Sequence, residues 1–194
     1  MALYDDLVDM VAIHVSPCPE SAIYDATRHV VRDLCKETRI WTYDCQDKRI
    51  TAEDDPVISL NIPEGSTIIH LWGINGRCGV YGEDSLDYYL SPPDKLMFNK
   101  PDRMVGKLVQ PLVSLMPSMS SGEYPDFIME YFSEGLISGI VSYLQMQPYR
   151  AWSQPNAAAP HQEKYQQTIK DAIQMRNNGL NISKVNRRIK PTFM

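Results

Sequence analysis

The sequence predicts an α+β fold: a mostly helical bundle with an inserted antiparallel β-rich middle and an extended C-terminal arm. Apolar residues recur with the helical period in residues 1–38 and again in residues 119–179. Alternating and β-prone segments are confined to residues 39–118 between them. Residues 180–194 follow a helix stop at Gly179 and are too few to build a core. Segregated helices and strands of this kind are typical of α+β proteins.

The first segment, 1–38, predicts two helices. Leu3, Leu7, Met10 and Val11 are spaced for one face of a short helix over Ala2–Ile13, which prolines 17 and 19 end. Asp5, Asp6 and Asp9 are expected on its exposed face. A second helix begins near Pro19, because proline suits the first helical turn, and its apolar stripe includes Cys35 as a small buried group.

The middle segment predicts strands near residues 40–43, 56–62, 67–74, 77–81, 86–90 and 104–115. Asn75-Gly76 is the dipeptide preferred in a two-residue type I′ turn and predicts a hairpin. Pro92-Pro93 is expected to end the strand before it. Pro111 is expected to confine the last strand to an edge or to break it, because proline donates no ladder hydrogen bond.

The third segment, 119–179, predicts a helix over Pro125–Gln145 and a polar helix from about His161 to Asn178, capped by Gly179. A linker that contains Trp152, Pro155 and Pro160 is expected between them. Gly135 and Gly139 lie one helical turn apart. Outside a membrane this spacing indicates close packing against a neighbouring helix.

The sequence carries no motif of a catalytic, cofactor or metal site. The spacing Gly73-x-x-Gly76-x-x-Gly79 differs from a dinucleotide loop. Glu53-Asp54-Asp55 lacks the spacing of a calcium loop and is expected to be solvated. Cysteines 18, 35, 45 and 78 form no C-x-x-C pair and are expected to be free thiols. Sequence leaves a Cys35–His29 or Cys78–His70 nucleophilic pair open. We nevertheless predict that the chain is not an enzyme and needs no cofactor or metal.

The N-terminus and the apolar runs indicate neither a cleaved signal nor a membrane span. Acidic Asp5-Asp6 stands where a signal peptide would carry positive charge. The longest apolar run, 136–144, is far shorter than the roughly 20 residues that a spanning helix needs. We therefore expect no membrane partner.

The charge of the C-terminal arm, residues 180–194, differs from that of the rest of the chain. The chain has a net charge of −5 and the arm carries +4 without an acid, which leaves −9 for the residues before Leu180. A purely solvating tail would also avoid apolar residues such as Ile182, Val185, Ile189 and Phe193, which this arm contains. The alternative is a frayed terminus. We predict a docking arm that adds to a partner protein through eight residues: Ile182, Lys184, Val185, Arg187, Arg188, Ile189, Lys190 and Phe193.

Several segments together resemble phage head-to-tail adaptor (connector) proteins. They are Cys18-Pro19, the helix with Ala26, Arg28 and Leu34-Cys35, then Thr38-Arg39-Ile40-Trp41, Tyr88–Pro93, Glu134–Gly139 and Gln147–Trp152. The resemblance covers most of the chain.

The resemblance implies a structural protein of the virion neck, made in the host cytoplasm. It implies a homo-oligomeric ring, expected to hold about twelve copies, between the portal and a tail or nozzle protein. Genomic DNA would pass through the ring without specific binding, which suits an acidic body. On this analogy the arm would grip the portal.

Two other functions fit parts of the sequence. The first alternative is a small cytoplasmic binding or regulatory module whose basic tail contacts nucleic acid. The acidic body argues against it, because phosphate contacts need clustered cations. The second alternative is a cysteine-dependent enzyme, which would need surroundings that favour a thiolate.

Overall fold

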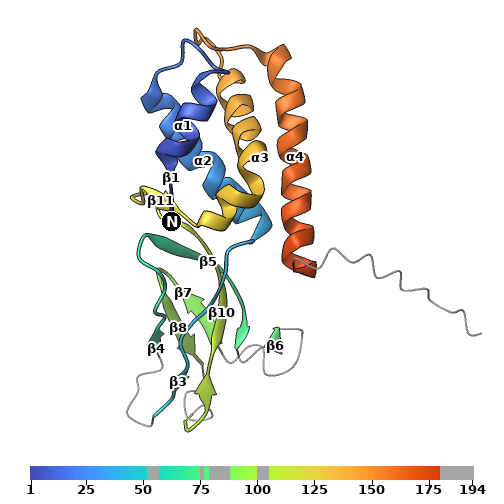
Figure 1. Ribbon diagram of the computed structural model, residues 1–194. Coiled ribbons are helices and arrows are strands. Elements are labelled where there is room, and N and C mark those ends of the chain that lie inside the picture. The colour runs from blue at the N-terminus through green and yellow to red at the C-terminus, as the bar shows by residue number, and fades with distance from the viewer. Residues whose placement is uncertain (52–56, 75–76, 79–87, 100–104, 180–194) are drawn as a thin grey trace, which may run out of the picture.

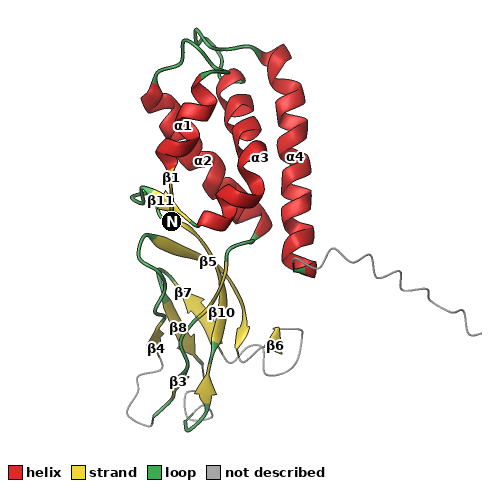
Figure 2. Cartoon of the chain, in the orientation of Figure 1, coloured by secondary structure: helices red, strands yellow, loops and turns green. Residues whose placement is uncertain are grey.

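The computed structural model describes residues 1–51, 57–74, 77–78, 88–99 and 105–179 (Figure 1). In this part of the chain, helices α1 (Tyr4–Ala12) and α2 (Glu20–Thr38) precede most of the strands. Helices α3 (Asp126–Gln145) and α4 (Pro155–Asn178) follow them. Figure 2 shows the helices gathered in one half of the molecule and most of the strands in the other. The predicted α+β class is confirmed.

The four helices run alternately up and down in one bundle (Figure 1). α2 begins after Pro19, as predicted, and ends at Thr38, because the φ of 52° at its C-cap Arg39 is left-handed and stops the helix. Its apolar stripe lies in the bundle core, and Cys35 is fully buried. The exposed face of α1 carries Asp5, Asp6 and Asp9, also as predicted.

Close packing of α3 against α4 depends on two glycines. A Cβ placed on Gly135 would lie 2.1 Å from Thr168 Oγ1, and one on Gly139 would lie 2.7 Å from Tyr165 Cδ2. Neither distance is possible for real atoms, so both positions need glycine. The close packing predicted from their spacing is confirmed.

The largest sheet in the described residues has the strand order β2-β10-β5-β6. Its strands are β2 (Thr42–Asp44), β10 (Pro111–Pro117), β5 (Ser66–Ile74) and β6 (Arg77–Cys78). Ile74 pairs with Arg77 and Gly73 with Cys78, so the predicted hairpin is present. The turn residues Asn75-Gly76 lie outside the described residues, as do Glu53–Asp55 and Gly79.

Three smaller antiparallel groups complete the described strands. β4 (Val57–Ser59), β8 (Lys95–Phe98) and β7 (Tyr88–Ser91) form one sheet in the order β4-β8-β7. β3 (Lys48–Arg49) pairs with β9 (Leu108–Val109). β1 (Ala2–Leu3) pairs with β11 (Glu123–Tyr124) beneath the bundle, where the Tyr4 and Tyr124 rings stack at 5.1 Å.

The predictions made from prolines are confirmed at two places and wrong at a third. Pro92-Pro93 ends β7 but also turns the chain into β8, a strand that the sequence did not predict. Pro111 breaks the predicted strand into β9 and β10, which confirms one of the two predicted outcomes. The edge alternative is wrong, because β10 is an inner strand. Pro111 is tolerated there because it is the first residue, and its carbonyl still accepts from Cys45 N at 2.9 Å. Pro160 lies inside α4, which begins at Pro155 and leaves a shorter linker than predicted.

Each half of the molecule has its own core. One cluster of buried residues fills the bundle and a second fills the β layers, and Phe127 of α3 packs against both. A hydrogen bond also crosses the junction, because the Arg32 guanidinium of α2 donates to Pro117 O of β10. The two halves are therefore held in contact by apolar packing and by this hydrogen bond.

Candidate functional site

The eight predicted docking residues all lie in 180–194, outside the described residues. The structure does describe the point from which this arm continues. α4 ends at Asn178, and its C-cap Gly179 has a φ of +63°, a value that favours glycine. The predicted cap is confirmed, and the base of the arm is the last turn of α4, beside the junction between the two halves (Figure 1).

Arg176 fixes this last turn to both halves. One guanidinium nitrogen donates to Thr38 O at the end of α2, at 2.6 Å. The same guanidinium carbon lies 5.2 Å from the centroid of the Trp72 ring in β5, within cation–π range. Thr38 is fully buried, so water cannot reach its carbonyl. Without the Arg176 guanidinium this buried acceptor would lose a hydrogen-bond donor, which costs stability.

Trp72 is the centre of a small basic cluster. The Arg39 guanidinium carbon lies 5.8 Å from the centroid of the Trp72 ring. The His70 and Trp72 rings pack in a T-shaped arrangement, with 4.7 Å between their centroids. The Trp72 indole N–H donates to Ser114 Oγ at 2.6 Å, and that hydroxyl donates to Arg39 O at 3.3 Å. Burial lowers the pKa of His70, and the two arginines lower it further. The cluster thus joins α2, α4, β5 and β10 around one side chain.

An acidic groove adjoins the base of the arm. Two neighbouring hollows between α3 and α4, of about 350 and 400 Å³, share Tyr131, Phe132 and Asp171 in their lining. We call them together the α3/α4 groove. Gly179 lines the lower hollow, and Lys164 lines the upper one. Glu130 and Glu134 add two more carboxylates to the upper hollow.

The opposite end of the bundle exposes apolar side chains. Ile13 after α1 is 79% exposed, and Met146 and Tyr149 after α3 are 51% and 102% exposed. The His14 and His161 rings lie 6.4 Å apart at the same end, joining the end of α1 to the start of α4. Single exposed apolar residues are ordinary on protein surfaces, and only a contiguous apolar patch marks a contact surface.

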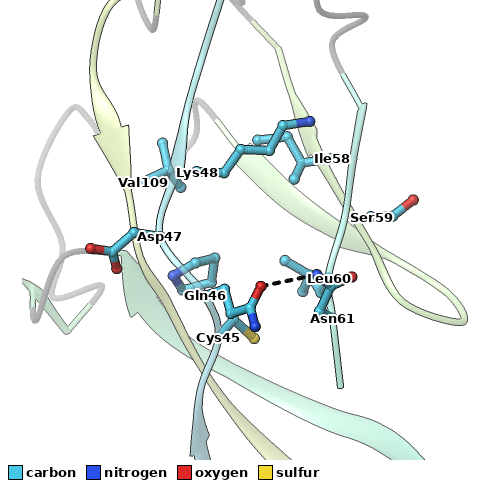
Figure 3. A pocket seen from close by; sticks show the side chains of 10 residues that line it. Cys45, Gln46, Asp47, Lys48, Ile58, Ser59, Leu60, Asn61 and Val109 are labelled. Atoms are coloured by element: carbon cyan, nitrogen blue, oxygen red, sulfur yellow. Dashed lines mark hydrogen bonds between the residues drawn. The ribbon is translucent and has the colours of Figure 1, made fainter. Parts of the chain in front are cut away.

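The β half contains a cavity of about 210 Å³ between residues 45–48 and residues 58–61 (Figure 3). Asn61 Nδ2 donates to Gln46 Oε1 across it at 3.3 Å. Cys45 also lines the cavity, and burial raises the pKa of its thiol to about 11, with Asp44 adding to the rise. A thiol with so high a pKa is a poor nucleophile at neutral pH.

The cysteine–histidine pairs left open by the sequence gain no support. Burial raises the pKa of the Cys35 thiol to about 12. His29 instead lies against the Tyr143 ring, at 4.7 Å between ring centroids. The side chain of Cys78 lies outside the described residues, so the Cys78–His70 pair stays untested.

Two features are absent from the part of the chain that the structure describes. No group of three or more metal-ligating side chains occurs there. Within the same residues, no helix has the length and apolar character to cross a membrane.

No protein-family model matches the chain, and no curated protein matches it with significant similarity.

The Trp72 cluster was not predicted from the sequence. Arg176 lies in the predicted last helix, and Trp72 lies in the predicted strand near residues 67–74. No local pattern connects these two residues, because they meet only when α4 packs across the end of the sheet.

Proposed function

We propose that this chain is a structural head-to-tail adaptor of a phage virion, in which a ring of identical copies joins the portal to the tail. The arm docks on the portal through Ile182, Lys184, Val185, Arg187, Arg188, Ile189, Lys190 and Phe193. Genomic DNA passes through the ring without specific binding. The proposal rests on the resemblance of the sequence segments to adaptor proteins and on the architecture of the body.

The observation that carries the proposal is the anchorage of the arm's base. Arg176 holds the last turn of α4 to Thr38 and Trp72, and so to both halves of the body. A docking arm transmits force and position only if its base is fixed. An arm that merely frayed from a helix end would need no such anchor.

The body also supplies surfaces for further contacts. The end of the bundle remote from the arm exposes Ile13, Met146 and Tyr149. In the β half, Tyr89 of β7 and Leu108 of β9 are 47% and 49% exposed. A ring subunit needs different patches that face its two neighbours, because head-to-tail contacts are heterologous.

Mass photometry of the full chain, alone and mixed with its cognate portal, tests the proposal. The mixture should give a complex of portal and several copies of this chain. The arm's four cations imply that it docks on acidic surface of the portal. Reversing these cations (Lys184, Arg187, Arg188 and Lys190, each to Glu) should therefore abolish this complex, because the acidic arm would repel that surface.

A matched control reverses four cations exposed on the body: Lys36, Arg49, Lys95 and Lys107, each to Glu. This variant has the same net charge as the arm variant and should retain portal binding. A wild-type chain that stays separate from the portal would contradict the proposal. Equal loss in both variants would contradict the role of the arm.

A further inference from the structure

The α3/α4 groove ends at the residue from which the arm continues. Gly179 lines its lower hollow, and residues 180–194 follow directly. We propose that in the free chain this groove binds the chain's own arm, residues 180–194. The inference concerns the protein before it meets any partner, so it goes beyond the adaptor function and does not depend on it.

Charge supports this occupant. The groove is lined by the carboxylates of Glu130, Glu134 and Asp171. Its one lining cation in the described residues, Lys164, already donates to Glu134 Oε2 at 2.9 Å, and this contact lowers the pKa of Glu134. The arm brings four cations and no acid. Opposite charge on a groove and on the chain beside it favours their contact.

The apolar surfaces also match. Tyr131 is 51% exposed at the rim of the groove, with buried Phe132 and half-buried Met175 beside it. The arm has an apolar residue at 182, 185, 189 and 193, interleaved with its cations. Seating these side chains on Tyr131 and Met175 would remove apolar surface from water on both sides.

The arm is long enough to follow the groove. From Gly179 back to Lys164, α4 rises about 22 Å at 1.5 Å a residue. The arm, if extended, spans up to about 50 Å. A tethered segment has a high effective concentration at a site next to its own base. The chain's own arm therefore has the advantage over the arm of a second copy.

Trypsin cleavage of the full chain tests the inference, because the arm holds cleavable bonds after Lys184, Arg187 and Arg188. A synthetic peptide of residues 180–194 gives the unprotected rate under each condition. The protection ratio is the peptide rate divided by the rate for the same bonds in the chain. We expect a ratio well above one at low salt, which falls toward one as salt screens the charges.

The paired variant Glu130→Gln and Asp171→Asn removes two groove charges and preserves side-chain size. It should lower the protection ratio several-fold. The control Asp5→Asn with Asp9→Asn removes two exposed charges from α1 and should leave the ratio unchanged. The salt series on the wild-type chain gives the same answer if the groove variant fails to fold.

Three results would overturn the inference. A protection ratio of one in the wild-type chain at low salt would show that the groove does not bind the arm. A ratio that rises with protein concentration would assign the groove to a second copy's arm. Equal loss of protection in the groove variant and the control would mean that the groove is not the site.

Discussion

Arg176 in the last turn of α4 lies over Trp72 in β5, with 5.2 Å between the guanidinium carbon and the ring centroid. The same guanidinium donates to the buried Thr38 carbonyl at 2.6 Å. One side chain thus ties the end of the fourth helix to the second helix and to the sheet. This contact fixes the last turn of α4, after which residues 180–194 follow.

Replacing Arg176 should destabilise the body. Arg176→Ala removes a cation–π contact and a partner of a buried carbonyl, so we expect the free energy of unfolding to fall by about 1–3 kcal/mol. Arg176→Lys should recover part of the loss, because lysine keeps the charge but not the planar fork. Urea unfolding followed by circular dichroism measures both.

Arg150→Ala is the matched control. Arg150 also lies over a tryptophan, 5.7 Å from the Trp152 ring centroid, but it is exposed and its partner is in the same loop. We expect this change to cost less than about 0.5 kcal/mol. If the two alanine variants lose the same stability, the Arg176 contact is not a tie between the halves.

Gly135→Ala should weaken the α3–α4 contact. The new Cβ would lie 2.6 Å from Thr168 Cβ, so rotating the threonine side chain cannot relieve the overlap and the helices must separate. We expect a loss of about 1–3 kcal/mol, typical of overpacking. Gly122→Ala is the control, since its nearest neighbour would be Tyr24 Oη at 3.9 Å. Thermal unfolding of the two variants should therefore differ; matching midpoints would refute the packing argument.

Stability should decline in alkaline solution through the buried thiols. The folded chain holds the Cys35 proton up to a pKa of about 12, whereas the unfolded thiol has its ordinary value of 9.0. The neutral thiol therefore stabilises the fold fully below pH 9.0, and this contribution is lost as pH rises from there toward the folded value. Cys35→Ala should show a shallower decline just above pH 9.0 in urea titrations. An unchanged slope would show that Cys35 is not buried.

The helices were largely predictable because their signals are local. The apolar period and Pro19 predicted α2, and the spacing of Gly135 and Gly139 predicted close packing of α3. Pro160 misled the prediction because a proline inside a helix costs about 3 kcal/mol on its own. In the structure α4 includes it, and Ala158 beside it is fully buried. Tertiary packing outweighed the local preference.

The strand β8 and the Trp72 cluster were not predictable in the same way. β8 has four residues and follows directly on a proline turn, so no long alternation marks it. The Trp72 cluster assembles Arg39, Ser114 and Arg176 from three distant segments. Such contacts depend on how the sheet meets the bundle, which periodicity does not specify.

DNA should bind weakly to the full chain. The residues before Leu180 are acidic, and the four arm cations limit the slope of log K against log salt to about −4 at most. We expect no detectable binding to duplex DNA at physiological salt in a fluorescence anisotropy titration. Tight binding with a steep slope would instead favour a nucleic-acid-binding module.

Deletion of residues 180–194, assayed in parallel for thermal unfolding and for portal binding, tests the adaptor account most directly. The account predicts a nearly unchanged unfolding midpoint together with loss of the complex with portal. A truncated chain that still binds portal as the full chain does would contradict the docking arm. A truncated chain that unfolds would show that these residues belong to the folded body.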